Sequence, residues 1–196
     1  MAAMEYDAII LAGGRAGRLG GIDKALIEIG GRSLLATAVA AANRARSTVV
    51  VGPERPGFQG ICFLLDTPQS GPLHALSVGL EVGSAPLVAV LAADLPFVTV
   101  AMVERLAVAV GDADGAILVD DSGRDQYLLA VYRRSALEAS LDELPSATDA
   151  PMGDAVRSLQ LVRIMDAAAT GDCDTPEDVT AARRLTEEEE GVRGVD

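Results

Sequence analysis

The chain has 196 residues, a formal net charge of −13, and 49% hydrophobic residues against only 3% aromatic ones. This length suits one domain whose core is built from Ala, Val, Leu and Ile. The acidic charge argues against an extended nucleic-acid interface, and no basic leader or long apolar run indicates secretion or a membrane span, so we expect a cytoplasmic protein.

Apolar runs alternate with segments of helical periodicity along the chain. The predicted strands are Asp7–Leu11, Thr48–Val51, Ile61–Leu65, Leu87–Ala92, Ala116–Val119, Leu128–Tyr132 and Leu161–Ile164. The predicted helices are Leu34–Arg46, Pro72–Val82, Val100–Val110, Ser135–Leu144, Gly153–Leu159 and Thr175–Leu185. This alternation predicts a single α/β domain of the Rossmann-like, doubly wound class, with helices on both faces of a mostly parallel sheet.

Two further expectations concern chain direction and the C-terminus. The turn Asp120–Gly123 precedes the segment Leu128–Tyr132, which we expect to be the one antiparallel strand. The domain is expected to span residues 1–185. Residues 186–196 contain the run Glu187–Glu190 and are predicted to form a disordered acidic tail.

The first predicted strand leads into a loop, Leu11–Lys24, that carries five glycines, two arginines and a lysine. Glycines let several backbone N–H groups converge on one ligand, and the fixed cations add full charges, so the loop is typical of a polyphosphate site. It is not a P-loop, because Lys24 is followed by Ala25. It also fits the dinucleotide fingerprint of an NAD-dependent oxidoreductase poorly, because no helix begins until about Ser33. A simple tight turn is the plainer alternative.

Acidic residues follow several predicted strands or lie in loops on the same side, where ligands bind in open α/β sheets. Asp94 comes directly after a buried strand and is the best candidate ligand for Mg²⁺, which prefers one or two carboxylates plus phosphates. Asp174 is either a second metal ligand or a charge at the start of a helix. Asp66 either contacts the nucleoside or fixes its own loop.

Lys24 and Arg18 are the cations that we expect to contact phosphate and to stabilise the departing pyrophosphate. The two cysteines, Cys62 and Cys173, form no metal-binding pair, and each is expected to be a buried free thiol. The only histidine, His74, is expected to be structural or exposed at a rim.

The motif Leu-Ala-Gly-Gly-x-x-x-Arg-Leu-Gly-Gly-x-Asp-Lys (Leu11–Lys24) resembles the opening of the molybdenum cofactor guanylyltransferases, which are glycosyltransferase-A-like nucleotidyltransferases. Four later motifs lie in the family's order: Gly71-Pro72-Leu73, Ala93-Asp94-Leu95-Pro96, Tyr127–Tyr132 and Asp174-Thr175-Pro176-Glu177-Asp178. The resemblance covers the chain up to about Leu185.

The resemblance implies a Mg²⁺-dependent transfer of GMP from GTP to molybdenum–molybdopterin, with molybdoenzyme-maturation proteins as further partners. It implies that Leu11, Ala12 and Gly13 line the guanine nucleotide, that Lys24 and Arg18 contact phosphates, and that Asp66 serves the nucleoside. It also implies that Asp94 binds both GTP and Mg²⁺.

The chain departs from the family at three places. Gly52 stands where the family often has Asn after the second strand, and Asp172-Cys173-Asp174 replaces an Asn-x-Asn pattern. The segment Pro145–Pro151 lacks the cation that family members often place near the anionic acceptor. Three alternative functions therefore stay open. The protein could transfer a cytidylyl group to molybdopterin, transfer a nucleotide to a sugar or polyol phosphate, or bind GTP without turnover.

Overall fold

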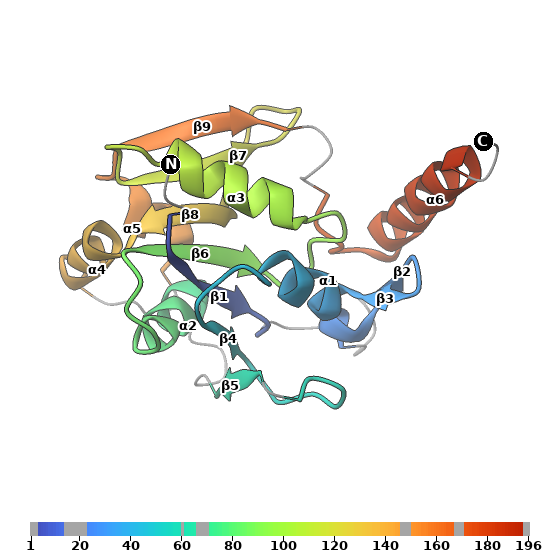
Figure 1. Cartoon of the computed structure of the whole chain (residues 1–196), viewed down its shortest axis with the longest axis horizontal. Coiled ribbons are helices and arrows are strands. Elements are labelled where there is room, and N and C mark those ends of the chain that lie inside the picture. The colour runs from blue at the N-terminus through green and yellow to red at the C-terminus, as the bar shows by residue number, and fades with distance from the viewer. Residues whose placement is uncertain are drawn as a thin grey trace.

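The computed structural model describes residues 4–13, 23–59, 61–65, 71–145, 150–166 and 171–193. A seven-stranded sheet runs through the molecule in the order β5-β4-β1-β6-β8-β7-β9 (Figure 1). Its strands are β1 (Tyr6–Leu11), β4 (Thr48–Val51), β5 (Cys62–Leu64), β6 (Leu87–Ala92), β7 (Gly115–Val119), β8 (Asp125–Arg133) and β9 (Leu161–Met165). The helices are α1 (Leu34–Ala41), α2 (Gly71–Leu80), α3 (Val100–Ala109), α4 (Arg134–Asp142), α5 (Met152–Val156) and α6 (Pro176–Arg193).

The two central strands, β1 and β6, are buried on both faces. Alternate side chains of each strand enter two separate hydrophobic clusters, because successive residues of a strand point to opposite faces. Helices α1 and α3 contribute to one cluster, while α2, α4 and α5 contribute to the other. The continuous apolar runs thus reflect a sheet with helices on both faces, as predicted.

Strand β1 lies between β4 and β6 and is parallel to both. The chain therefore leaves β1 toward one edge of the sheet and later returns to its other side at β6. Such a reversal of strand order leaves a crevice beyond the carboxyl ends of the two strands. Ala12 and Gly13, which follow β1, and the turn containing Asp94 all lie there.

Strand β8 is the antiparallel strand, and it pairs with β6 on one side and β7 on the other. It begins at Asp125, earlier than the predicted Leu128, because the turn held by Asp120 leads directly into it. Asp120 Oδ1 accepts hydrogen bonds from the backbone N–H groups of Ser122 and Arg124, each at 2.9 Å. The sequence pattern missed the first residues because they are polar.

Several shorter features differ from the sequence predictions. Helix α1 ends at Ala41 rather than Arg46. Cys173 is a buried free thiol as expected, but Cys62 is exposed, because it lies on β5 at the edge of the sheet. A small hairpin, β2 (Glu28–Ile29) and β3 (Arg32–Ser33), and a 3₁₀ helix, η2 (Lys24–Leu26), precede α1. Strands this short have no periodicity from which to predict them.

Helix α6 leaves the body of the molecule and packs beside β2 and β3 (Figure 1). It continues to Arg193, past the predicted helix end at Leu185, so the segment expected to be a disordered tail is helical as far as Arg193. Glutamate has a high helix propensity, which favours continuation through this acidic run. Among the described helices, none is both long and apolar enough to cross a membrane.

A buried ion pair anchors the start of β1, at the end of the sheet opposite the crevice. Asp7 Oδ2 accepts hydrogen bonds from Arg134 Nη2 at 2.8 Å and from the Ala85 N–H at 2.7 Å, and Oδ1 accepts one from the Ser47 hydroxyl at 2.7 Å. Burial alone would raise the pKa of Asp7, but these donors outweigh that effect, and the pKa lies below its usual value. This network fixes β1 to the loops on both sides of it.

Candidate active site

Two strand ends form the floor of the crevice. The Ala12 N–H donates to the Val51 carbonyl at 2.8 Å, and the Ala93 N–H donates to the Leu11 carbonyl at 3.0 Å. These bonds extend the sheet pairing just beyond the strands, so Leu11 and Ala12 are buried while Gly13 is exposed. Asp94 therefore follows a rigid strand, as the sequence predicted.

Lys24 forms ion pairs with two carboxylates of the candidate site. Its Nζ lies 2.8 Å from Asp94 Oδ2 and 2.5 Å from Asp174 Oδ1. The Lys24 side chain is 21% exposed and that of Asp94 is 25% exposed. Burial alone lowers the pKa of Lys24, but the two carboxylates outweigh it and the net shift is upward. The lysine is thus a fixed cation in a partly desolvated setting, where its charge acts strongly.

The start of α6 positions Asp174. Asp178 Oδ2 accepts hydrogen bonds from the N–H groups of Asp174 at 3.1 Å and Thr175 at 2.7 Å, and the Asp178 N–H donates to Thr175 Oγ1 at 3.2 Å. This reciprocal capping box holds the first turn of the helix. The Cys173 N–H donates to the Asp94 carbonyl at 3.1 Å, which ties this segment to the end of β6.

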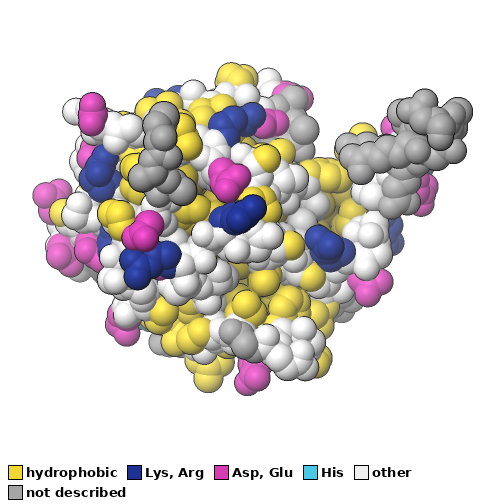
Figure 2. Space-filling model, viewed as in Figure 1, with side chains coloured by type: hydrophobic (Ala, Val, Ile, Leu, Met, Phe, Trp, Pro, Cys, Tyr) yellow, Lys and Arg dark blue, Asp and Glu magenta, His cyan; other side chains and the backbone are white. Residues whose placement is uncertain are grey.

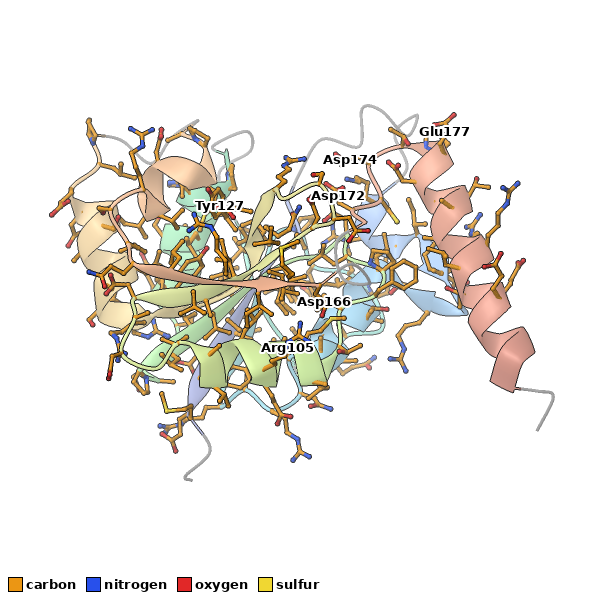
Figure 3. All side chains as sticks on the ribbon, turned by 90° about the horizontal axis from the view of Figure 1, so that it is seen from above. Arg105, Tyr127, Asp166, Asp172, Asp174 and Glu177 are labelled. Atoms are coloured by element: carbon orange, nitrogen blue, oxygen red, sulfur yellow. The ribbon has the colours of Figure 1, made fainter. Side chains whose placement is uncertain are left out.

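Asp172 adds further negative charge on the same segment. Figure 3 shows Asp172 and Asp174 on the stretch that leads into α6, with Glu177 at the beginning of the helix. Partial burial and the charges of Asp174 and Asp94 raise the pKa of Asp172. Arg124 lowers the pKa of Asp172 in part, so the three carboxylates Asp94, Asp172 and Asp174 lie close enough to influence one another while Lys24 pairs with two of them.

A second ion pair holds the residue before Lys24. Arg55, only 8% exposed, donates from Nε to Asp23 Oδ2 at 2.7 Å and from Nη2 to Asp23 Oδ1 at 3.0 Å. Asp23 Oδ1 also accepts from the Ala25 N–H at 3.1 Å and caps η2. The role of Arg55 has no signal in the sequence, because an arginine in the polar turn Pro53–Pro56 has the pattern of a solvent-exposed residue.

The structure brings Leu11, Ala12, Gly13, Lys24, Asp94 and Asp174 to one end of the sheet, as the sequence predicted. Arg18 and Asp66 lie outside the described residues. Gly52 packs against the backbone of the loop: a Cβ there would lie 2.8 Å from the Ala12 carbonyl oxygen. Glycine at this position lets β4 approach the loop closely.

A divalent metal would find two carboxylates here, those of Asp94 and Asp174. The described residues contain no group of three or more His, Cys, Asp or Glu side chains that could by itself hold a metal ion. A site of two carboxylates is still suited to Mg²⁺, which takes its other ligands from water and phosphate oxygens. Basic and acidic side chains lie interspersed on the face drawn in Figure 2.

Residues 8–164 match the model of the MobA-like NTP transferase domain. The chain belongs to this family. MobA-like NTP transferases are nucleotidyltransferases, which act on nucleoside triphosphates. The ion pairs of Lys24 with Asp94 and Asp174 therefore lie in an enzyme of this family.

Curated relatives within the MobA-like family are guanylyltransferases. The molybdenum cofactor guanylyltransferase of Mesorhizobium japonicum is 34% identical over 142 residues, which cover 67% of this chain and 68% of the relative. The probable molybdenum cofactor guanylyltransferase of Natronomonas pharaonis is 28% identical over 200 residues, covering 91% and 97% of the two chains.

Solved structures confirm the fold. Molybdopterin-guanine dinucleotide biosynthesis protein A from Archaeoglobus fulgidus superposes with a TM-score of 0.73 at 20% identity, over 93% of this chain and 99% of the other. The 2-C-methyl-D-erythritol 4-phosphate cytidylyltransferase of Thermus thermophilus superposes with a TM-score of 0.71 at 22% identity, over 94% and 100% of the two chains. Both support the doubly wound α/β class.

Proposed function

We propose that this MobA-like protein transfers GMP from GTP to molybdenum–molybdopterin, forming the guanine dinucleotide cofactor and releasing pyrophosphate. The observation that carries the proposal is the position of Lys24, whose ammonium lies beside Asp94 and Asp174 at the carboxyl end of the sheet. The guanylyltransferase names of the curated relatives favour GTP as donor and molybdopterin as acceptor.

The nucleotide would bind where β1 ends. Leu11, Ala12 and Gly13 form the edge of the crevice, and the exposed backbone of Gly13 leaves room for a close approach by the base or the phosphates. On this proposal Lys24 and Arg18 contact the phosphates, and Asp66 serves the nucleoside.

Asp94 and Asp174 are the proposed ligands of Mg²⁺. When bound, Mg²⁺ neutralises charge on the phosphate oxygens. In the structure the Lys24 ammonium neutralises the same carboxylates. We infer that Lys24 exchanges these carboxylates for phosphate oxygens when the nucleotide and metal bind, because each cation then keeps an anionic partner.

The reaction that these residues support is an in-line displacement. A terminal phosphate oxygen of the acceptor forms a bond to the α-phosphorus of GTP. The bond from that phosphorus to the oxygen bridging to the β-phosphate breaks, and pyrophosphate leaves with the electron pair. Lys24 would stabilise the negative charge that develops on the α-phosphate and the leaving group.

Pyrophosphate release tests the proposal directly. Purified protein with Mg²⁺ and GTP should release pyrophosphate only after molybdopterin is added, and CTP should support much slower release. Equal turnover with CTP, or none with either nucleotide, would contradict the guanylyl assignment. A thermal-shift screen of the four nucleoside triphosphates gives a second measure, because a ligand that binds the native state stabilises it according to its occupancy.

A further inference from the structure

The guanidinium of Arg55 connects two segments that are distant in sequence. Besides its bidentate pair with Asp23, Arg55 donates from Nη2 to the Ala12 carbonyl at 3.0 Å and from Nη1 to the Pro53 carbonyl at 3.0 Å. Nearly all of its N–H donors therefore have partners. Ala12 and Asp23 are the residues on either side of segment 13–22, so one buried side chain holds both ends of the glycine-rich loop.

The contact with Asp23 also reaches Lys24. Asp23 caps η2 through its bond from the Ala25 N–H, and Lys24 is the first residue of that 3₁₀ helix. The orientation of the cap therefore sets the direction in which the Lys24 side chain leaves the backbone. Arg55 thus bonds to Asp23, and the backbone joins Asp23 to Lys24, whose ammonium lies beside Asp94.

Arg55 does not serve as a phosphate ligand in this arrangement. The Asp23 carboxylate neutralises its charge through two parallel N–H···O bonds, a pairing that matches the fork of the guanidinium. A buried arginine is uncommon unless it is paired, because removing its charge from water is costly. Its contacts are with loop ends and an adjacent carbonyl, which points to a role in holding the loop.

We propose that Arg55 is a positioning residue of the nucleotide site: it fastens both ends of the loop 13–22 and thereby places Lys24 for phosphate binding. The role in GTP binding rests on the proposed function, whereas the fastening of the loop does not. A cation that is already in position when the ligand arrives does not have to be ordered by it, which lowers the entropic cost of binding. Arg55 would thus increase affinity without touching the nucleotide.

The test compares Arg55→Ala, Arg55→Lys and Asp23→Asn with the control Arg46→Ala. Arg46 makes an exposed ion pair with Glu5, far from the crevice. Trypsin cleavage after Arg15 and Arg18, followed by mass spectrometry on the ligand-free protein, reports how firmly the loop ends are held. Titration with a fluorescent GTP analogue reports affinity.

We expect Arg55→Ala to speed loop cleavage and weaken GTP binding, each by about tenfold, while cleavage elsewhere stays slow. Arg55→Lys should recover only part of the affinity, because a lysine cannot make the bidentate pair. The double variant Arg55→Ala with Asp23→Asn should bind GTP no more weakly than Arg55→Ala, since both changes break one link. Arg46→Ala should match the wild type.

Unchanged loop cleavage in Arg55→Ala and in Asp23→Asn would overturn the proposal. So would faster cleavage that is spread evenly over the chain, because that result indicates general unfolding. If Arg55→Ala does not fold, Asp23→Asn still tests the link, since it changes only the charge of the partner. If wild-type protein fails to bind GTP, the proposed function fails, while the cleavage comparison still decides whether Arg55 fastens the loop.

Discussion

The ammonium of Lys24 lies 2.8 Å from Oδ2 of Asp94, although the two residues are 70 positions apart in the chain. Asp174, 150 positions from Lys24, completes the group at 2.5 Å. Lys24 begins η2, Asp94 follows the end of β6, and Asp174 lies in the segment before α6. The two ion pairs join the cation of the site to its carboxylates.

Asp94→Asn should reduce turnover to background, because an amide replaces the carboxylate proposed to hold Mg²⁺ at the end of a rigid strand. The side chain keeps its shape, so the fold should remain and the melting temperature should change little. Asp112→Asn is the matched control, since Asp112 is exposed and precedes β7 at the opposite end of the sheet. Retained turnover in Asp94→Asn would show that the metal is held elsewhere.

Lys24→Gln should bind Mn²⁺ more tightly than the wild type when no nucleotide is present. The substitution removes a positive charge from between two carboxylates. We expect the affinity for Mn²⁺ to rise about tenfold, because the ammonium no longer competes with the metal for these carboxylates. Electron paramagnetic resonance of free Mn²⁺ measures this affinity. Lys24→Arg keeps the charge and should bind Mn²⁺ as weakly as the wild type. Weaker binding in Lys24→Gln would mean that the metal does not share these carboxylates.

Gly52→Ala should weaken GTP binding, because the new Cβ would lie 2.8 Å from the Ala12 carbonyl oxygen and 3.1 Å from the Gly13 nitrogen. The loop backbone must move to relieve this contact, at a cost to stability of about 1–3 kcal/mol. Gly57→Ala is a close control, because both glycines have a positive φ, +150° for Gly52 and +91° for Gly57. A Cβ on Gly57 would meet nothing within 4 Å. An equal loss of affinity in both variants would exclude a specific role for the close approach.

Arg134→Met should lower the free energy of unfolding by about 3–5 kcal/mol at neutral pH, because it leaves the Asp7 carboxylate buried without its partner. The two side chains are only 10% and 4% exposed. Arg46→Met breaks an ion pair whose side chains are 57% and 61% exposed, so it should cost less than about 1 kcal/mol. Urea denaturation measures both.

The cost of Arg134→Met should shrink in acid. The folded-state pKa of Asp7 lies below its ordinary value of 3.8, so its ionised form stabilises the wild type above that value. This stabilisation is lost as the pH falls through the folded-state pKa, and a variant without Arg134 has less of it to lose. Denaturation at pH 7 and again at about pH 3, a little below the ordinary pKa of an aspartate, should show the difference in unfolding free energy narrowing. A constant difference would show that Arg134 acts through packing alone.

Local sequence was sufficient for much of the fold. The apolar runs of β1 and β6 predict strands buried on both faces, because a side chain that alternates between two covered faces is apolar on each. The Thr175 and Pro176 pair predicts the start of α6, since capping depends on neighbours in the chain. The position of Asp94 directly after a buried run likewise identifies it as a crevice residue.

Only the tertiary structure placed Lys24 between Asp94 and Asp174, and only it revealed the contacts of Arg55 with Ala12 and Asp23. Periodicity reports on residues within a few positions of one another, whereas these contacts depend on strand order and on how far each loop reaches. A charged side chain in a turn has the same local pattern whether it faces solvent or a buried carboxylate. The sequence by itself therefore determined the fold class and the residues at the strand ends, while packing decided which charges meet.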